Sequence, residues 1–214
     1  MDEQPVRITP TANGPYQLEG VSSISRMRDG TDIDTPARAF LCRCGGSSNK
    51  PFCDGTHARN GFSGERDTDR VPDLRDDYVN GNLTIHDNRG LCAHAGRCTD
   101  KLAAVFRLGT EPFIDPAGAT AEEIINVIAM CPSGALSYSI DGVEHRDGGG
   151  PSSVGFAPGG PYVVSGGCEL DGVELPDGAT TDHLALCRCG ASQNKPFCSG
   201  KHWYVDFDED AATE

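Results

Sequence analysis

The sequence predicts an α+β protein made of small units rather than of one large core. Three observations lead to this: few apolar residues, an internal repeat, and a central segment unlike the repeats. Only 37% of the 214 residues are hydrophobic and 7% aromatic, whereas 27 are Gly and 14 are Pro. Such a chain is too poor in apolar residues to fill a large core. We therefore expect its ten cysteines to add stability as metal ligands or disulfides.

The charge and the N-terminal residues narrow the class of protein. The chain has 18 basic and 32 acidic residues, a net charge of −14, which argues against nucleic acid and anionic membranes as partners. Residues 1–10 lack the basic and apolar regions of a secretory signal. No run approaches the roughly 18 apolar residues of a membrane span. We expect a cytoplasmic protein without membrane attachment, in which clustered cysteines bind metal rather than pair.

The same module occurs at both ends of the chain. The repeated strings are GPY (14–16 and 160–162), LCRCG (41–45 and 186–190) and NKPFC (49–53 and 194–198). We predict two β-rich modules, over residues 5–65 and 160–207, that pack together as a pseudo-dimer within one chain. A monomer with an internal pseudo-two-fold axis follows from this arrangement.

The segment between the modules has a different pattern, and we assign residues 78–144 to a separate domain. We expect strands and helices at 82–86 (strand), 100–106 (helix), 112–114 (strand), a helix from Thr120 ended by Pro132, and 136–140 (strand). The longer helix opens with a capping box formed by Thr120 and Glu123. Residues 145–159 are rich in Gly and Pro and are expected to form a flexible linker. Residues 206–214 are expected to form an acidic, solvated tail.

Both terminal modules carry the spacing C-x-C-x8-C-x3-H. The two sets are Cys42, Cys44, Cys53 and His57, and Cys187, Cys189, Cys198 and His202. Three thiolates and one imidazole form a complete ligand set for zinc or for an iron–sulfur centre. The spacing alone leaves both metals open.

The surrounding residues resemble the CDGSH iron–sulfur domain of mitoNEET-like proteins. The first copy, from Cys42 to His57, matches that signature in full, whereas the second has Ser199 in place of the aspartate and Lys201 in place of the small residue. The resemblance covers residues 5–62 and 160–207. It implies a [2Fe-2S] cluster held by three Cys and one His in each module. This chain departs from mitoNEET in lacking its membrane anchor and in carrying both copies itself.

Histidine ligation has consequences for the redox chemistry. A neutral imidazole in place of a thiolate raises the potential of a cluster, and it can protonate or leave the iron near physiological pH. We therefore expect a pH-sensitive potential at both outer centres. The carboxylate of Asp54, where the second module has Ser199, predicts a lower potential for the first centre. Four cations near the ligands either offset cluster charge or are solvated: Arg43, Lys50, Arg188 and Lys195.

The central domain contains Cys92, Cys98 and the distant pair Cys131-Pro132. This pattern resembles three-cysteine ferredoxins and divergent single-cluster ferredoxin domains, because Ala95 stands where a further cysteine ligand would be. The resemblance implies a ferredoxin-like fold with a [3Fe-4S] cluster. The alternative is [4Fe-4S] with His94 as fourth ligand, although we favour a loop histidine that only lies near the cluster. Cys168 is left over and is expected to be a buried free thiol.

No serine–histidine–acid set, phosphate loop or dinucleotide fingerprint occurs in the chain. We therefore do not expect an enzyme. The favoured function is one-electron transfer among three iron–sulfur clusters, with docking to a basic patch on a redox partner protein that the sequence does not identify. The alternatives are storage or transfer of iron or iron–sulfur clusters, and an interaction scaffold in which the metals are purely structural.

Overall fold

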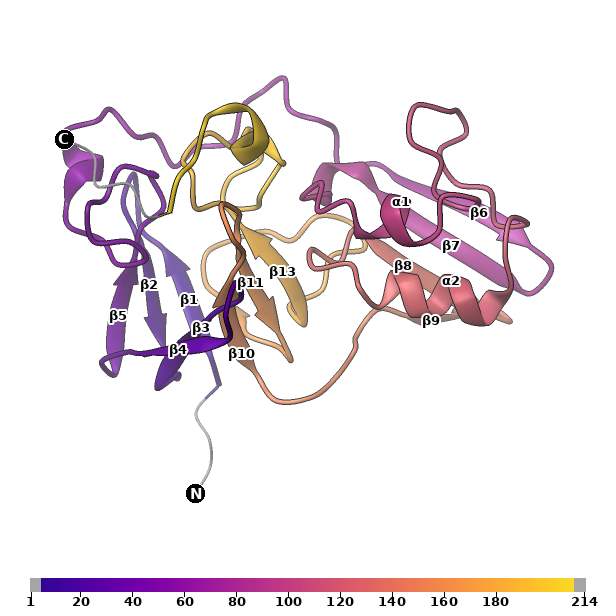
Figure 1. The fold of residues 1–214 in the computed structure, drawn as a ribbon, viewed down its shortest axis with the longest axis horizontal. Helices are drawn as coiled ribbons and strands as arrows, with labels where there is room; N and C mark the ends of the chain where they lie inside the picture. Colours follow the sequence, from indigo (N-terminus) through magenta and orange to yellow (C-terminus); the bar gives the residue numbers. More distant parts are fainter. Residues whose placement is uncertain (1–4, 210–214) are drawn as a thin grey trace.

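The computed structural model describes residues 5–209, which form mostly small β-sheets with few helices. Figure 1 shows the two repeated modules side by side, with the central domain next to the second module. This arrangement of two repeats around a different domain is the one the sequence predicts. Within the described residues, no helix is long and apolar enough to cross a membrane.

Each terminal module contributes the same three-stranded antiparallel unit. The strands are β1 (Arg7–Pro10), β2 (Tyr16–Glu19) and β5 (Arg38–Leu41) in the first module, and β10 (Ser153–Phe156), β11 (Tyr162–Ser165) and β13 (His183–Leu186) in the second. β2 lies between β1 and β5, and β11 lies between β10 and β13. Alternate residues of β2 and β11 are buried, as expected for strands with one face on a core.

The two modules exchange strands. β3 (Ser23–Arg26) belongs to the first half of the chain but pairs in parallel with β10 of the second module, and β4 (Thr31–Asp34) extends that sheet. In return, β12 (Glu169–Leu170) pairs in parallel with β1. The results are a five-stranded sheet, β13-β11-β10-β3-β4, and a four-stranded sheet, β12-β1-β2-β5. Each sheet is therefore completed by the opposite half of the chain.

The expected flexible linker at residues 145–159 is wrong in part, because β10 lies inside it. Val154 and Phe156 are both 3% exposed, and β10 is paired on one side with β11 and on the other with β3. The Gly and Pro residues that suggested a linker flank a strand of only four residues. Its pairing comes from segments distant in sequence, which local composition does not report.

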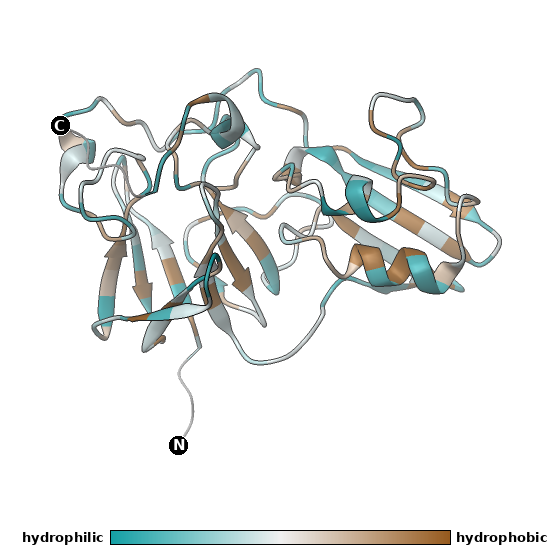
Figure 2. Cartoon of the chain, viewed as in Figure 1, coloured by the Kyte–Doolittle hydropathy of each residue, from teal (hydrophilic) through white to brown (hydrophobic). Residues whose placement is uncertain are grey.

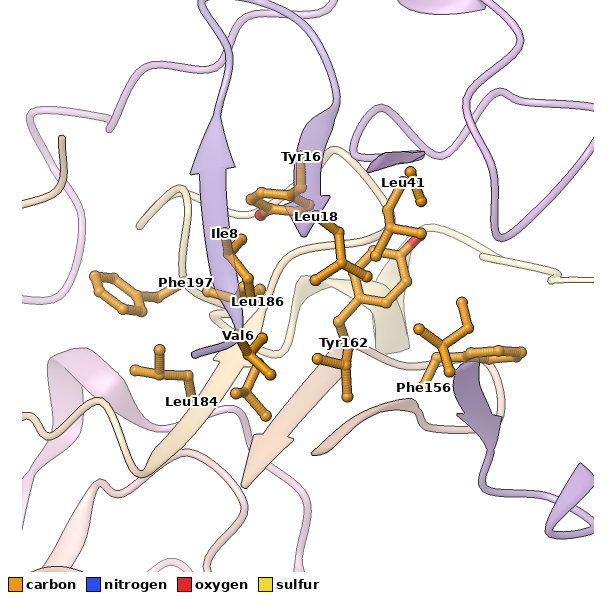
Figure 3. Packing of buried hydrophobic residues seen from close by; sticks show 14 of the residues in the cluster. Val6, Ile8, Tyr16, Leu18, Leu41, Phe156, Tyr162, Leu184, Leu186 and Phe197 are labelled. Atoms are coloured by element: carbon orange, nitrogen blue, oxygen red, sulfur yellow. The ribbon is translucent and has the colours of Figure 1, made fainter. Parts of the chain in front are cut away.

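One hydrophobic core joins the two modules. Side chains from both halves interdigitate there (Figure 3), and the brown bands on the strands in Figure 2 mark the apolar positions. At its centre, the rings of Tyr16 and Tyr162 meet edge to face, with centroids 6.0 Å apart and an interplanar angle of 89°. Both residues are 1% exposed. The predicted pseudo-dimer is thus built around a shared core.

The central domain is a four-stranded antiparallel sheet with two helices. Its elements are β6 (Arg75–Asn80), β7 (Leu83–Asn88), α1 (Arg97–Lys101), α2 (Ala121–Ile128), β8 (Leu136–Ile140) and β9 (Val143–His145). The strand order is β6-β7-β8-β9. Ile124 of α2 and Ile85 of β7 are fully buried in one core between helix and sheet. Leu91 and Ala135, by contrast, are buried in the core of the terminal modules, so the central domain is packed firmly against them.

Several local expectations hold and others shift. The capping box at Thr120 and Glu123 is formed, and β8 spans 136–140 as expected. The short helix expected at 100–106 instead begins at Arg97, after Gly96 in a left-handed conformation with φ of 75°. The expected strand at 112–114 is reduced to a single bridge, from Phe106 to Ile114. β6 is unexpected, because it is a mostly exposed edge strand without apolar alternation.

Replacing Tyr16 or Tyr162 by Phe should destabilise the protein by about 1 kcal/mol each, because each change removes a buried hydrogen bond and keeps the ring. The Tyr16 hydroxyl donates to carbonyl oxygens of the opposite module, 2.8 Å from that of Pro196. Denaturant unfolding of the cluster-loaded protein measures the loss. Tyr204→Phe is the matched control because Tyr204 is 83% exposed. Stabilities equal to this control would contradict a role for the hydroxyl bonds.

Candidate metal centres

The first ligand loop follows β5 directly. The Cys42 amide donates to the Pro51 carbonyl oxygen at 2.8 Å, and the Cys53 amide donates to that of Phe40 at 2.8 Å. These bonds bring the two halves of the loop together. His57 then lies on a single 3₁₀ turn, η1 (Thr56–Ala58), which aims its ring at the preceding cysteine.

The donors of this loop form two close pairs. Cys42 Sγ lies 3.8 Å from Cys44 Sγ, and Cys53 Sγ lies 3.3 Å from His57 Nδ1. The second module repeats this arrangement on the turn η3 (Lys201–Tyr204). There Cys187 Sγ and Cys189 Sγ are 3.9 Å apart, and Cys198 Sγ and His202 Nδ1 are 3.4 Å apart. All eight predicted outer ligands are therefore gathered into two matching sites.

The arrangement of the four donor atoms in two close pairs fits two metal ions per module better than one. Two donors on one tetrahedral metal, with bonds of about 2.3 Å to sulfur and about 2.0 Å to nitrogen, lie about 3.8 Å apart for S–S and about 3.5 Å for S–N. The observed distances match these edges within each pair. Among residues 5–209, no three His, Cys, Asp or Glu side chains come close enough to share a single ion. The donor set thus fits a binuclear cluster rather than mononuclear zinc.

Thiol protonation is strongly influenced by the loops. A hydrogen bond from Cys42 lowers the pKa of Cys44 to about 6, whereas burial raises the pKa of Cys198 to about 12. Backbone amides also point at sulfur: Gly46 at Cys44, Gly55 at Cys53 and Gly200 at Cys198, each at 3.4 Å. Such N–H donors favour thiolate and tune a bound cluster. The buried thiols need the positive charge of a metal to ionise.

The two outer ligand loops touch each other. Cys44 and Cys189 form an antiparallel bridge. Gly45 and Gly190 have φ of 74° and 81°, and a Cβ on either would lie within 2.4–2.5 Å of the opposite loop's carbonyl oxygen. Glycine is required here for both conformation and space. Each loop therefore packs against the other through its middle cysteine.

Three of the four cations near the ligands have structural roles that the sequence did not reveal. Arg43 and Arg188 are 3% and 1% exposed, and each donates to two backbone carbonyl oxygens of its own module. Lys195 is 8% exposed and its Nζ donates to the Ser192 carbonyl oxygen at 2.6 Å. Surface solvation is therefore wrong for these three residues. Lys50 also has a partner and is not free.

The predicted ligands Cys92, Cys98 and Cys131 line one cavity of about 290 Å³ in the central domain. The neutral thiol is favoured at Cys92, because burial raises its pKa to about 11. Phe113 and Leu136 also line the cavity, which makes its wall partly apolar. The three central cysteines are thus brought together, as the sequence predicts.

His94 lies at the mouth of this cavity but is also held by the second module. Its side chain is exposed, its φ is 54°, and its carbonyl oxygen accepts a hydrogen bond from Trp203 Nε1 at 3.2 Å. A Cβ built on Gly200 would lie 2.7 Å from His94 Cδ2. His94 therefore lies in the contact between the central and second ligand loops. Neighbouring Ala93 is buried in one small cluster with Ala185 and the ligand Cys198.

The contact with the central domain makes the two outer sites unequal. Cys198 and His202 are 2% and 7% exposed, whereas Cys53 and His57 are only half-buried. Asn194 of the second loop also donates to the Gly90 carbonyl oxygen of the central domain at 2.6 Å. The second site is therefore enclosed, and the first is open to solvent.

Two features near the sites were missed from the sequence, and the prediction for Cys168 is wrong in part. Asp87 and Arg89 line the central cavity, with Arg89 Nε 3.7 Å from Asp87 Oδ2, and burial raises the pKa of Asp87 to about 6. Glu209, within the expected solvated tail, is buried and paired with Arg188; residues 210–214 lie outside the described part. Cys168 is a free thiol but only half-buried, packed against the shared core.

Asp54→Asn should raise the potential of the first centre by tens of millivolts and leave the second unchanged. Asp54 accepts hydrogen bonds from the Ser48 and Thr56 amides, which hold its pKa well below the usual range and keep it charged beside Cys53. Ser199→Asp is the reciprocal variant and should lower the potential of the second centre. An EPR-monitored redox titration measures both. Equal shifts in the two centres would contradict this local charge effect.

Comparison with known proteins places each part of the chain. Residues 13–58 and 159–203 match the family described as iron-binding zinc finger, CDGSH type. Residues 78–141 match the divergent 4Fe-4S mono-cluster family. The chain is also 33% identical over 61 residues to an uncharacterised protein, YjdI, of Escherichia coli K12 and O157:H7, covering 28% of this chain and 80% of that protein. The chain is therefore an iron–sulfur protein of the CDGSH family, with one CDGSH domain on each side of a divergent 4Fe-4S mono-cluster domain.

Proposed function

We propose that this protein is a one-electron carrier in which three iron–sulfur centres lie in series. The observation that carries the proposal is the contact between successive ligand loops. The central loop meets the second outer loop at Ala93 and Cys198, and the second meets the first at Cys189 and Cys44. Bound clusters would supply reversible one-electron chemistry. The loops are in direct contact, and are buried where they meet at Ala93 and Cys198, which suits electron transfer without movement.

The burial of the three sites indicates which of them a partner protein can reach. The second site is enclosed between the other two, and the first is half-open at Cys53 and His57. We infer that partner proteins reach the first and central sites, while the second connects them. A net charge of −14 suits docking to a basic patch on a redox partner. A reducing cytoplasm is the proposed compartment, since all ten cysteines are free.

For the central centre we propose [3Fe-4S], because three cysteines line the cavity and three ligands complete such a cluster. The family match to a 4Fe-4S domain favours the alternative, which requires a fourth ligand. EPR of the oxidised protein separates the two, since an oxidised [3Fe-4S] centre is paramagnetic and an oxidised [4Fe-4S] centre is silent. An oxidised sample without the signal would overturn the three-iron proposal.

Transfer of clusters or iron is a second candidate function, favoured by the open first site. The half-buried Cys53 and His57 allow an acceptor to approach, whereas Cys198 and His202 do not. Loss of the first cluster to an apo-acceptor would support this function. Repeated reduction and oxidation without cluster loss would support electron transfer instead. A colourless protein loaded with zinc would overturn both and favour a scaffold.

Gly200→Ala should weaken the magnetic coupling between the central and second centres. The added Cβ would meet His94 and push the two loops apart. Gly55→Ala is a matched control, because Gly55 also has positive φ, 87° against 74°, but has open space where a Cβ would be. Spin–spin broadening in EPR of the reduced protein measures the coupling. Equal behaviour of the two variants would contradict the proposed contact.

Replacing both His57 and His202 by Cys should abolish the pH dependence of the outer potentials. Protonation of a histidine ligand favours the reduced state, so the wild-type potential should fall as pH rises. A thiolate ligand lacks this titration in the same range. Redox titrations at several pH values measure the slope. A slope that survives in the double variant would contradict histidine as its source.

A further inference from the structure

Arg43 and Arg188 occupy the same position in the two CDGSH domains. Their backbone bonds match: Arg43 Nε and Nη2 donate to the carbonyl oxygens of Gly14 (2.8 Å) and Thr11 (2.7 Å), and Arg188 Nε and Nη2 donate to those of Gly160 (2.9 Å) and Ala157 (3.0 Å). Aromatic rings flank both, with Phe62 5.2 Å from Arg43 and Phe207 5.0 Å from Arg188. The two arginines therefore form an internal comparison within one chain.

Among residues 5–209, only one of these buried guanidinium groups has a counter-ion. Arg188 Nη2 lies 2.7 Å from the buried Glu209 Oε2. In the repeat, the residue that corresponds to Glu209 is Gly64, and no carboxylate of residues 5–209 lies within ion-pair distance of Arg43. A buried charge without an opposite charge beside it is costly, even where it has hydrogen-bond partners. Arg43 is 3% exposed, so solvent reaches little of it.

Arg43 faces a cavity of about 340 Å³ between the two CDGSH domains. Arg66 and the buried Lys195 line the same cavity, as do the exposed Glu65 and Glu174. Arg66 Nε donates to the Lys195 carbonyl oxygen at 2.9 Å, which holds its guanidinium at the wall. The cavity is thus lined by three cations in a chain that is acidic overall.

The second domain shows how the matching space is used. There Phe156 corresponds to Pro10, and its ring lies 4.8 Å from Arg188. In the first domain, Pro10 and Gly64 line the cavity, and neither supplies an aromatic ring or a carboxylate. The cavity therefore lies where the first domain has the smaller residues Pro10 and Gly64 and the second has Phe156 and Glu209.

We propose that this cavity binds a small oxyanion, a phosphate or a carboxylate group, on Arg43. The anion would pair with Arg43 as the Glu209 carboxylate pairs with Arg188 in the second domain. Arg43 and Lys195 both line the cavity, and their side chains are of the charged kind that forms the strongest hydrogen bonds to such oxygens. The bound anion lies near the first centre, because Arg43 Nε donates to the Gly14 carbonyl oxygen and a Cβ on Gly14 would lie 3.6 Å from His57 Nε2.

Binding at this position couples the anion to the redox state of the first centre. A negative charge disfavours addition of an electron nearby, so the oxidised protein binds the anion more tightly than the reduced protein does. By linkage, the anion lowers the potential of the first centre, and the shift corresponds to the difference in the anion's binding free energy between the oxidised and the reduced protein. The second centre, next to the Arg188–Glu209 pair, is not affected.

Calorimetric titration of the cluster-loaded protein with inorganic phosphate, at ionic strength matched with chloride, tests the proposal. Lys195→Gln should weaken binding about tenfold, because a charged donor is lost. Lys50→Gln is the matched control, since Lys50 holds the same position in the other copy but does not line the cavity. Arg66→Gln is a second variant should Lys195→Gln fail to load clusters. Glu65→Gln should bind more tightly, because it removes a negative charge from the rim.

An acetate titration in parallel separates the two oxyanion classes, and saturable binding of either supports the proposal. The absence of saturable heat with both would overturn it. It would also be overturned if Lys195→Gln and Arg66→Gln bound phosphate as the wild type does. Binding seen only in Glu65→Gln would overturn it too, because Glu65 itself would then occupy the site. None of these outcomes depends on electron transfer, so they leave the proposed function to its own tests.

Discussion

The hydroxyl groups of Tyr16 and Tyr162 each bond to the ligand loop of the opposite module. Tyr16 reaches the carbonyl oxygens of Cys187 and Pro196, and Tyr162 reaches those of the matching residues in the first loop. The same pair of rings forms the centre of the shared core. Each module therefore helps to hold the ligand loop of the other. The exchange of β3 and β12 reinforces this dependence.

The central domain then breaks the symmetry that the repeat creates. It buries Leu91 and Ala135 in the shared core and covers Cys198 and His202 with its own ligand loop. The first site has no such cover. Two ligand sets of identical spacing therefore differ in exposure. In the proposed series, partner proteins reach the exposed first site and the central site, and the enclosed second site connects them.

Much of the candidate site could be predicted because ligand chemistry depends on residue type and spacing. The eight outer ligands and the three central cysteines lie where the repeat and the C-x5-C spacing indicate. β10 was missed because it is a short strand that pairs in parallel with β3 from the other half of the chain. β6 was missed because it is a mostly exposed edge strand without apolar alternation. The burial of Arg43, Arg188 and Glu209 was missed as well, because charged residues are mostly exposed unless they are paired.

By itself, the sequence determined the number of modules, the ligand sets and the capped helix of the central domain, which all follow from local pattern. Only the tertiary structure decided which strands belong to which sheet, and which ligand loops touch. It also decided that Arg188 has a carboxylate partner and Arg43 faces a cavity. The Arg188–Glu209 pair spans 21 positions, and the contacts between the two halves join residues more than a hundred positions apart, such as Tyr16 with Cys187. Such contacts are set by packing of the whole chain, and no local spacing encodes them.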